Sequence, residues 1–301
     1  MTAAVPASVI RRRRIPTPPS VFAFILVPFV IEAVWVFWPA VMGLYYSLTK
    51  WDGVGSPEFI GLDNFREMRD DEIFVQALGH TVVWVVLFGT LSVLFGLASA
   101  MFLKAERKGV GFYRAAMFTP VVFSLMVTSL VWRVMYQPKG TLNSLLDSVG
   151  LGGLKHLWLA EPSTALYAIL VAALWRQIGY IMVLYLAGLK SIDPTLMEAA
   201  AIDGASRWQS FRFVTMPQLK HVNTVVIAVI IIEGLRAFDI IFALTKGGPY
   251  HSTEVLSTYM YSTAFTTRRL GYGSALAVVI FLLAIGVIIT YLIRAIRGTE
   301  K

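Results

Sequence analysis

The sequence predicts an all-α, polytopic integral membrane protein with six transmembrane helices. Apolar amino acids make up 57% of the 301 residues and charged amino acids only 15%, whereas about a quarter of the residues in a soluble domain are charged. The apolar residues are also gathered in six continuous runs, each of which provides the about 20 residues that a helix needs to cross a bilayer. The strands of a membrane barrel would instead alternate apolar and polar side chains over about 10 residues.

The six apolar segments cover residues 21–49, 80–103, 113–136, 164–189, 222–245 and 273–294. They divide the chain into an N-terminal tail (1–20), a first helix (21–49), a loop (50–79), a core of five helices (80–296) and a C-terminal tail (297–301). The first segment follows a basic stretch, as in a signal peptide, but its apolar run of about 25 residues exceeds the usual 7–15. We therefore expect an uncleaved first transmembrane helix.

The basic residues are distributed unevenly over the loops between these segments. With a cytoplasmic N-terminus, fifteen of the 26 Lys and Arg residues face the cytoplasm and nine face the opposite side. The positive-inside rule then places both termini and the polar segment 190–220 in the cytoplasm. Because the basic residues are dispersed over many loops and form no single face, the net charge of +8 indicates contact with a lipid bilayer and not with a nucleic acid.

Several kinds of chemistry are excluded by what the sequence lacks. It contains no cysteine, and its four histidines, at positions 80, 156, 221 and 251, do not have the spacing of a metal site. It has no G-x-x-x-x-G-K-[ST] phosphate loop and no converging catalytic set. We therefore expect a transport subunit that is not an enzyme, with no catalytic residues and no metal or cofactor bound by this chain.

The polar segment 190–220 is predicted to fold into two short helices. Asp193 can cap a helix that starts at Pro194, because a carboxylate accepts hydrogen bonds from free N–H groups and proline suits the first turn. Gly204 permits a positive φ, which would end this helix near Asp203 and let a partner backbone approach closely. We expect a second short helix after this turn, with aromatic residues on one side.

The spacing of Glu198, Ala199, Ala200, Gly204 and Pro217 resembles the EAA loop of permease subunits in bacterial ABC importers. The resemblance implies that these five residues dock onto a separate ABC ATPase, which binds ATP and Mg, and couple its hydrolysis to transport. The alanines would seat in a cleft of the ATPase, and the glutamate would offer a negative charge to one of its arginines. Without the resemblance, the segment could be a simple connector between two spans. Coupling is favoured because the match to the EAA loop extends over several residues at fixed offsets and lies on the predicted cytoplasmic side.

Two other segments resemble the carbohydrate-uptake branch of this family, the maltose-type, binding-protein-dependent permeases. Residues 244–249 read L-T-K-G-G-P and are followed by Ser252-Thr253-Glu254, and residues 59–65 read F-I-G-L-D-N-F. Local chemistry alone predicts only a tight turn for the first segment. The second could be a docking strip or an ordinary surface turn.

This resemblance extends over roughly residues 20 to 296, nearly the whole chain. It implies the fold of an ABC type I importer permease in the plasma (inner) membrane of a bacterium, with a sugar as substrate. It also implies three kinds of partner: ABC ATPase subunits, a second homologous permease subunit, and an extracytoplasmic sugar-binding protein. ATP-driven closure of the ATPases would switch the access of the path from one side of the membrane to the other.

Charged residues inside the predicted spans are candidates for the substrate path, because charges at membrane depth are costly and usually face a cavity or a partner. Three of them recur at i, i+3 and i+6 on the fifth span, where they could line the path or form a self-neutralising structural triad. On the fourth span, residues 176–180 combine polar groups for sugar hydroxyls with an aromatic ring. The candidate path residues are Arg176, Tyr180, Glu233, Arg236, Phe238 and Asp239.

Three alternatives remain open at the level of sequence. A polyol or glycerol-phosphate importer would use a closely similar permease, and Arg176 and Arg236 would suit an anionic substrate. A self-sufficient secondary transporter often shows internal repeats and ion-coupling carboxylates at the midplane, but no convincing repeat is present. An integral membrane enzyme would need the converging catalytic set that is missing.

Overall fold

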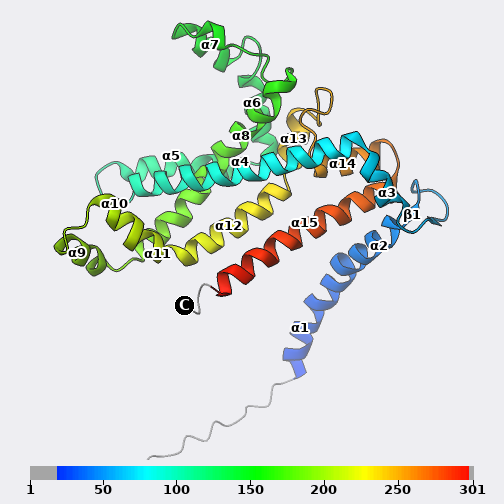
Figure 1. Ribbon diagram of the computed structural model, residues 1–301, viewed down its shortest axis with the longest axis horizontal. Coiled ribbons are helices and arrows are strands. Elements are labelled where there is room, and N and C mark those ends of the chain that lie inside the picture. The colour runs from blue at the N-terminus through cyan, green and yellow to red at the C-terminus, as the bar shows by residue number, and fades with distance from the viewer. Residues whose placement is uncertain (1–18, 298–301) are drawn as a thin grey trace, which may run out of the picture.

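Most of the residues in the computed structural model, which describes residues 19–297, are helical (Figure 1). In this part of the chain, four helices are long and apolar enough to cross a membrane. The number rises to as many as six if each of two bent pairs counts as one span, namely residues 110–122 with 125–135 and residues 207–218 with 220–235. A two-stranded antiparallel sheet, β1 (Thr49–Lys50) and β2 (Glu58–Phe59), follows the first helix. The prediction of an all-α polytopic membrane protein is confirmed; the two predicted tails lie almost wholly outside the described residues.

Three of the predicted spans are single long helices: α4 (Glu72–Phe102), α8 (Pro162–Lys190) and α15 (Leu270–Arg297). Helix α4 begins before the predicted start at residue 80, because one carboxylate oxygen of Asp71 accepts hydrogen bonds from two N–H groups of the first turn, at 2.9 and 3.2 Å. Such a cap starts a helix regardless of the hydropathy of the first turns. Hydropathy alone therefore predicted a helix that was too short.

The third predicted span, residues 113–136, is not one straight helix. Helix α5 (Val110–Val122) and helix α6 (Leu125–Met135) meet at an angle of 102°. Between them the chain is extended, and the hydroxyl of Ser124 accepts a hydrogen bond from the N–H of Val127 at 3.3 Å, which starts the second helix. The apolar composition is continuous across this break, so composition contained no signal for the change of direction.

The fifth predicted span, residues 222–245, is also interrupted. Helix α12 (Lys220–Leu235) ends where Arg236 leaves helical geometry, and helix α13 (Asp239–Leu244) begins three residues later. The expectation that Glu233, Arg236 and Asp239 share one helix face at i, i+3 and i+6 is therefore wrong. The first lies on α12, the last lies on α13, and the arginine lies in the turn between them.

Helices α4 and α8 pack against each other along their length and supply much of the core (Figure 1). Glycines permit this close approach: a Cβ atom on Gly96 would lie 2.5 Å from the Ile181 side chain, and one on Gly179 would overlap the backbone carbonyl of Met117 in α5. Small residues at helix crossings are typical of membrane bundles, in which close packing joins the helices. Core side chains include Trp84, Phe88, Ile169, Ile181, Met182 and Tyr185.

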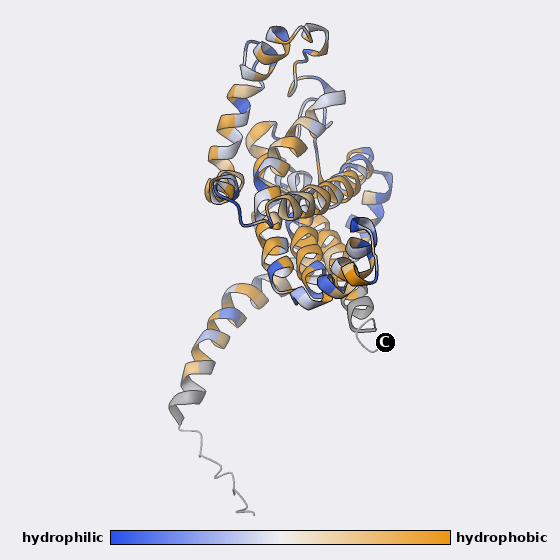
Figure 2. Cartoon of the chain, turned by 90° about the vertical axis from the view of Figure 1, so that its left-hand side faces the viewer, coloured by the Kyte–Doolittle hydropathy of each residue, from blue (hydrophilic) through white to orange (hydrophobic). Residues whose placement is uncertain are grey.

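The first span projects away from this bundle (Figure 1). It consists of α1 (Pro19–Glu32), a π-helical turn, η1 (Ala33–Phe37), and α2 (Trp38–Ser47). Helix α2 packs against α15, but none of the most hydrophobic stretch of the span is buried within the chain. Many of its large hydrophobic side chains are exposed, and Figure 2 shows several hydrophobic residues (orange) along this span. Such a surface requires lipid or another apolar protein surface to cover it.

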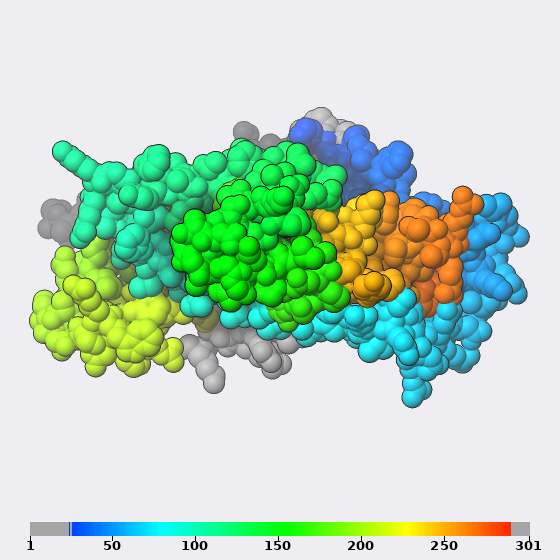
Figure 3. All heavy atoms as spheres, turned by 90° about the horizontal axis from the view of Figure 1, so that it is seen from above, coloured from blue at the N-terminus to red at the C-terminus, as the bar shows by residue number. Residues whose placement is uncertain are grey.

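The remaining elements lie around the bundle. They are α3 (Asp63–Asp70), α14 (Leu256–Tyr261) and η4 (Ser262–Thr266) near the start of α15, and α7 (Thr141–Ser148) with η2 (Gly152–Leu154) in a lobe beyond α6. Figure 3 shows this lobe (green) over the middle of the molecule, between segment 190–220 (yellow-green) at one end and the loop that holds β1 and β2 (light blue) at the other.

Candidate functional site

A pocket of about 220 Å³ lies between α4, α8, α12 and α13. Five of the six candidate path residues are in its wall, although they come from separate helices. They are Arg176, Glu233, Arg236, Phe238 and Asp239. The sixth, Tyr180, does not line the pocket and packs against the hydrophobic core.

The pocket lies where the third and the fifth predicted spans are interrupted. Leu125, the first residue of α6, forms part of its wall, and residues 236–238, which separate α12 from α13, form another part. Backbone outside a helix leaves N–H and C=O groups without intrahelical partners, and in membrane proteins such backbone is tolerated where it is buried in protein or lines a water-filled cavity. The two breaks thus produce a polar cavity inside an apolar bundle.

Arg133 joins the segments beyond the two breaks. Its guanidinium group, on α6, donates hydrogen bonds to the carbonyl oxygens of Ala243 and Leu244, the second at 3.4 Å. These carbonyls end α13, and a cation at a helix C-terminus is favourable because the free carbonyls carry partial negative charge. Helices α6 and α13 consequently pack together, whereas α5 and α12 pack against α8 and α4.

The charged groups of the pocket comprise two cations, Arg176 and Arg236, and two carboxylates, Glu233 and Asp239. Their formal charges therefore cancel. Among the described residues, no ion pair within 4 Å joins any two of them. Both carboxylates and Arg236 are exposed, so these groups are free to contact a ligand or another subunit.

Three hydrogen-bond donors of the pocket-lining residues are buried and have no partner among the described residues: Trp84 Nε1, Arg176 Nε and Gln177 Nε2. The side chains of Trp84 and Gln177 are only 2% and 4% exposed. Buried donors are normally hydrogen-bonded, since an unpaired one costs about 1–3 kcal/mol. Sequence reasoning did not single out Trp84, because a tryptophan in a run of Val and Leu has the pattern of ordinary core packing.

Segment 190–220 folds into the short helices that the sequence predicts. They are α9 (Pro194–Ile202), α10 (Arg207–Ser210), η3 (Phe211–Thr215) and α11 (Met216–Gln218). One oxygen of Asp193 accepts a hydrogen bond from the N–H of Thr195 at 2.9 Å, which starts α9 and holds the pKa of Asp193 below its usual value. Ser206 and Gln209 form a reciprocal capping box at the start of α10.

Gly204 ends α9 in the conformation that the sequence predicts. Its φ is +74°, its N–H donates to the carbonyl of Ala201 at 3.1 Å, and the N–H of Ala205 donates to the carbonyl of Ala200 at 2.9 Å. This pair of bonds is the Schellman motif, which satisfies the last carbonyls of a helix and requires a left-handed residue. A glycine adopts that conformation without steric cost.

The chain leaves most of the EAA-like residues uncovered. Glu198, Ala199, Gly204 and Pro217 are exposed, and Ala200 is half-buried. The opposite side of α9 faces the protein, where the hydroxyl of Thr215 lies 3.8 Å from the sulfur of Met197. Helix α9 is therefore attached along one side only, and its other side is available to a partner.

A comparison with known families identifies the chain. The family model described as "Binding-protein-dependent transport system inner membrane component" matches residues 92–298, which include α8, α12, α13 and segment 190–220. The chain belongs to this family. The permease therefore belongs to the broad family that its sequence resembles.

Three relatives match nearly the whole permease. A probable ABC transporter permease protein of Pyrococcus horikoshii is 35% identical over 96% of this chain and 100% of its own length. The multiple sugar-binding transport system permease protein MsmF of Streptococcus mutans is 33% identical over 93% of this chain and 96% of its own. The sn-glycerol-3-phosphate transport system permease protein UgpA of Agrobacterium fabrum is 33% identical over 89% of this chain and 92% of its own.

A solved structure has the same fold as the permease. A chain of a bacterial ABC transporter involved in the import of the acidic polysaccharide alginate superimposes with a TM-score of 0.82, over 92% of this chain and 95% of the other. Because the two sequences are only 21% identical, this match establishes the architecture alone.

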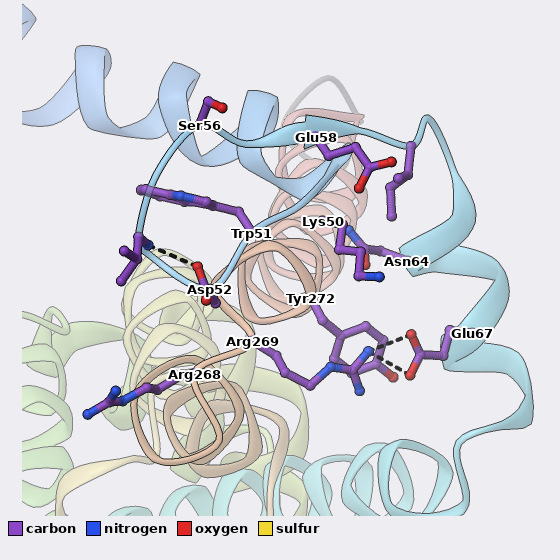
Figure 4. Close-up of a pocket in the computed structure, with 12 residues that line it drawn as sticks. Lys50, Trp51, Asp52, Ser56, Glu58, Asn64, Glu67, Arg268, Arg269 and Tyr272 are labelled. Atoms are coloured by element: carbon purple, nitrogen blue, oxygen red, sulfur yellow. Dashed lines mark hydrogen bonds and ion pairs between the residues drawn. The ribbon is translucent and has the colours of Figure 1, made fainter.

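A second and larger pocket of the permease, of about 620 Å³, lies at the start of α15 (Figure 4). Arg269 Nη2 lies 2.7 and 2.6 Å from the two carboxylate oxygens of Glu67, and its guanidinium lies 4.6 Å from the ring centre of Tyr272. The hydroxyl of Tyr272 donates to Asp71 at 2.6 Å. These side chains pair with one another, which indicates a structural junction between the loop after the first span and α15.

The two carbohydrate-type segments have local structural roles. In segment 59–65, Asn64 is 4% exposed and its amide nitrogen donates to the carbonyl oxygens of Ser47 and Thr49, each at 2.9 Å. In segment 244–249, Gly247 has a φ of +88° and forms part of a tight turn, as its sequence predicts.

Proposed function

We propose that the permease is one of two homologous transmembrane subunits of an ABC importer and forms half of the passage for a carbohydrate. The observation that carries this proposal is the pocket at the two helix breaks, which gathers five of the six candidate path residues. Sugar hydroxyls would meet the charged and amide groups, and the rings of Phe88 and Phe238 would stack on C–H faces. Apolar walls with a few convergent polar groups are typical of small-molecule sites. The Streptococcus mutans relative supports the substrate class.

In this proposal, segment 190–220 docks onto a separate ABC ATPase, which holds the ATP and Mg. The exposure of its EAA-like residues supports this role. The segment also connects two pocket helices directly, since α9 follows α8, and the chain from α10 to α11 enters α12 at an angle of 71°. A movement imposed on α9 by closing ATPases would therefore reach both sides of the pocket and change its access.

The proposal places the permease in the plasma membrane of a bacterium, with both termini and segment 190–220 in the cytoplasm. The excess of Lys and Arg in those parts supports this orientation. An extracytoplasmic binding protein would deliver the sugar at the opposite face. The unburied first span offers an apolar surface to lipid or to the second permease subunit.

A glycerol-phosphate or polyol substrate is the second candidate. The Agrobacterium relative transports sn-glycerol 3-phosphate according to its name and is as similar to the permease as the sugar-type relative. Arg176 and Arg236 in the pocket wall could contact a phosphate.

Co-purification from native membranes in mild detergent tests the proposed assembly. We expect mass spectrometry to find an ABC ATPase, a second permease and a binding protein with the chain. Recovery of the chain alone, under conditions that preserve known membrane assemblies, would contradict the proposal and favour a transporter that works by itself.

Glu198→Ala tests the coupling role. We expect uptake to fall at least about tenfold while the chain still reaches the membrane, because an ion pair across a buried interface is lost and its partner charge is left unpaired. ATP hydrolysis and uptake are measured together in proteoliposomes. The control is Glu72→Ala, which removes an exposed glutamate from the other end of the molecule. Equal uptake by both variants would refute the coupling role.

A further inference from the structure

We propose that the pocket at the helix breaks selects an uncharged, hydroxyl-rich ligand, and that the unpaired donors of Trp84, Arg176 and Gln177 bind its oxygen atoms. This inference rests on the proposed function, since it concerns the same passage. It assigns Trp84 and Gln177 to substrate selection and decides between the two substrate classes, a neutral sugar and an anionic polyol phosphate.

The charge of the pocket favours the neutral class. Arg176 and Arg236 are balanced by Glu233 and Asp239 in the same wall. Such carboxylates compete with a phosphate for the N–H donors of the arginines and repel its negative charge. A phosphate that entered this pocket would meet two carboxylates as well as two guanidinium groups. A neutral ligand avoids that repulsion and adds no net charge to an apolar bundle.

The unpaired donors indicate what the neutral ligand must contain. All three are N–H groups, one on α4 and two on adjacent residues of α8, and all are buried without a partner among the described residues. They would be satisfied by the oxygen atoms of a ligand once the pocket wall rearranges. The carboxylates of Glu233 and Asp239 can only accept hydrogen bonds when ionised. A hydroxyl both donates and accepts, so a polyhydroxylated ligand can satisfy both sets of groups.

The size and the rings of the pocket narrow the ligand further. About 220 Å³ is below the about 300–1,000 Å³ that drug-sized ligands occupy, so this conformation accommodates a single small ring. Phe238 lines the pocket beside the charged groups, and Phe88 stacks on Trp84 with a ring-centre distance of 5.9 Å. The geometry therefore fits one sugar unit at a time, held by its hydroxyls and covered by aromatic rings.

The first arm of the test identifies the substrate class. Cells that carry the chain with its partner subunits are given labelled glucose, xylose, maltose, cellobiose and sn-glycerol 3-phosphate, one at a time. We expect uptake of at least one neutral sugar and at least about tenfold slower uptake of the phosphate. Faster uptake of sn-glycerol 3-phosphate would overturn the inference but leave the importer intact. Uptake of none of the five by cells in which the assembled complex is found would overturn this inference, whereas absence of the complex itself would overturn the proposed function.

The second arm tests the donors with the sugar that is taken up fastest. Trp84→Phe removes the indole N–H donor, and Gln177→Leu removes the amide N–H donors. We expect each substitution to reduce the maximal uptake rate about tenfold, since a buried oxygen atom of the ligand then loses its hydrogen-bond partner. Trp132→Phe is the matched control, because Trp132 Nε1 is also buried and unpaired but lies outside the pocket. Gln76→Leu makes the corresponding change at an exposed position on α4. Both controls should stay within twofold of the unchanged protein.

A comparison with deoxy sugars separates ligand contact from a defect in folding. Immunoblots and co-purified ATPase establish that each variant is present and assembled. If a donor contacts one hydroxyl of the ligand, removing the donor costs nothing further for the analogue that lacks this hydroxyl. The substitution should therefore slow the uptake of at least one such analogue less than it slows the uptake of the parent sugar. Equal losses for the parent and for every deoxy analogue would show a merely structural role and overturn the inference, as would pocket variants that behave like their controls.

Discussion

At the scale of single residues, Asp71 connects three elements that are far apart in the sequence. One of its oxygens caps α4, and the other accepts hydrogen bonds from the hydroxyls of Tyr259 and Tyr272, at 2.5 and 2.6 Å. Burial of the carboxyl group raises its pKa, but the hydrogen bonds from the two tyrosines and from the α4 backbone outweigh burial and lower the pKa of Asp71. The ionised form is therefore the one that the fold stabilises.

We expect Asp71→Asn to reduce the stability of the folded chain by about 1–2 kcal/mol at neutral pH, because one or more partly buried hydrogen bonds to a charged group are lost. The pKa is lower in the folded state than its usual value of 3.8. The stabilisation is therefore fully present above pH 3.8 and is lost as the pH falls through the folded pKa. Thermal unfolding of the purified complex from pH 7 downward measures the effect, which should shrink below pH 3.8.

The control for this experiment is Asp70→Asn, which makes the same change at the exposed neighbouring residue. Its unfolding temperature should match that of the unchanged protein. If Asp71→Asn and Asp70→Asn unfold at the same temperature at pH 7, the junction does not depend on Asp71.

At the scale of elements, the end of α9 shows how one residue sets the direction of a segment. The Schellman bonds turn the chain at Gly204, and the capping box of Ser206 and Gln209 starts α10 directly afterward. A Cβ atom at Gly204 would meet no atom within 4 Å. Any penalty of a substitution there must therefore come from the positive φ itself and not from crowding.

We expect Gly204→Ala to destabilise this turn by about 1 kcal/mol, the order of the penalty for a left-handed residue that carries a Cβ. Backbone amides of residues 200–206 should then exchange with solvent about fivefold faster, since local opening becomes that much more frequent. Hydrogen exchange followed by mass spectrometry measures this. Gly111→Ala is the control, because Gly111 also has open space around it but no positive φ. Unchanged exchange at residues 200–206 would show that the turn is held by other contacts.

At the scale of the whole molecule, the two helix breaks and segment 190–220 form one connected system. Helices α6 and α13 are joined by Arg133 on one side of the pocket. Helices α8 and α12 lead from the pocket to the short helices of segment 190–220. Lys190 at the end of α8 also pairs with Glu106, beyond the end of α4, at 2.9 Å. A movement of α9 would therefore act on the pocket through helices and not through flexible loops.

Because the chain contains no cysteine, its orientation can be tested without a background signal. We expect a membrane-impermeant thiol reagent to label Val54→Cys in intact cells and Gln218→Cys only after the membrane is opened, because the two exposed positions lie at opposite ends of the molecule. The unchanged chain is the control and should remain unlabelled. Labelling of both positions in intact cells, or the reverse pattern, would contradict the proposed orientation.

Local rules predicted much of the fold because they act over a few residues. Asp193 as a cap and Gly204 as a left-handed terminator depend only on neighbouring backbone groups, and both are found where the sequence places them. Hydropathy likewise identified α4, α8 and α15, because lipid selects for composition. It failed at Ser124 and Arg236, where the chain changes direction without a change in average hydropathy.

The sequence by itself determined the class of the protein, the long helices α4, α8 and α15 and the EAA-like pattern of segment 190–220, since these follow from composition and from contacts between near neighbours. Only the tertiary structure decided that Arg176, Glu233, Arg236, Phe238 and Asp239 share one pocket and that Tyr180 does not. It also added Trp84 and showed that the charges in the pocket balance. The physical reason is that a cavity between broken helices depends on helix directions and on contacts between distant segments, neither of which has a period or a spacing in the sequence.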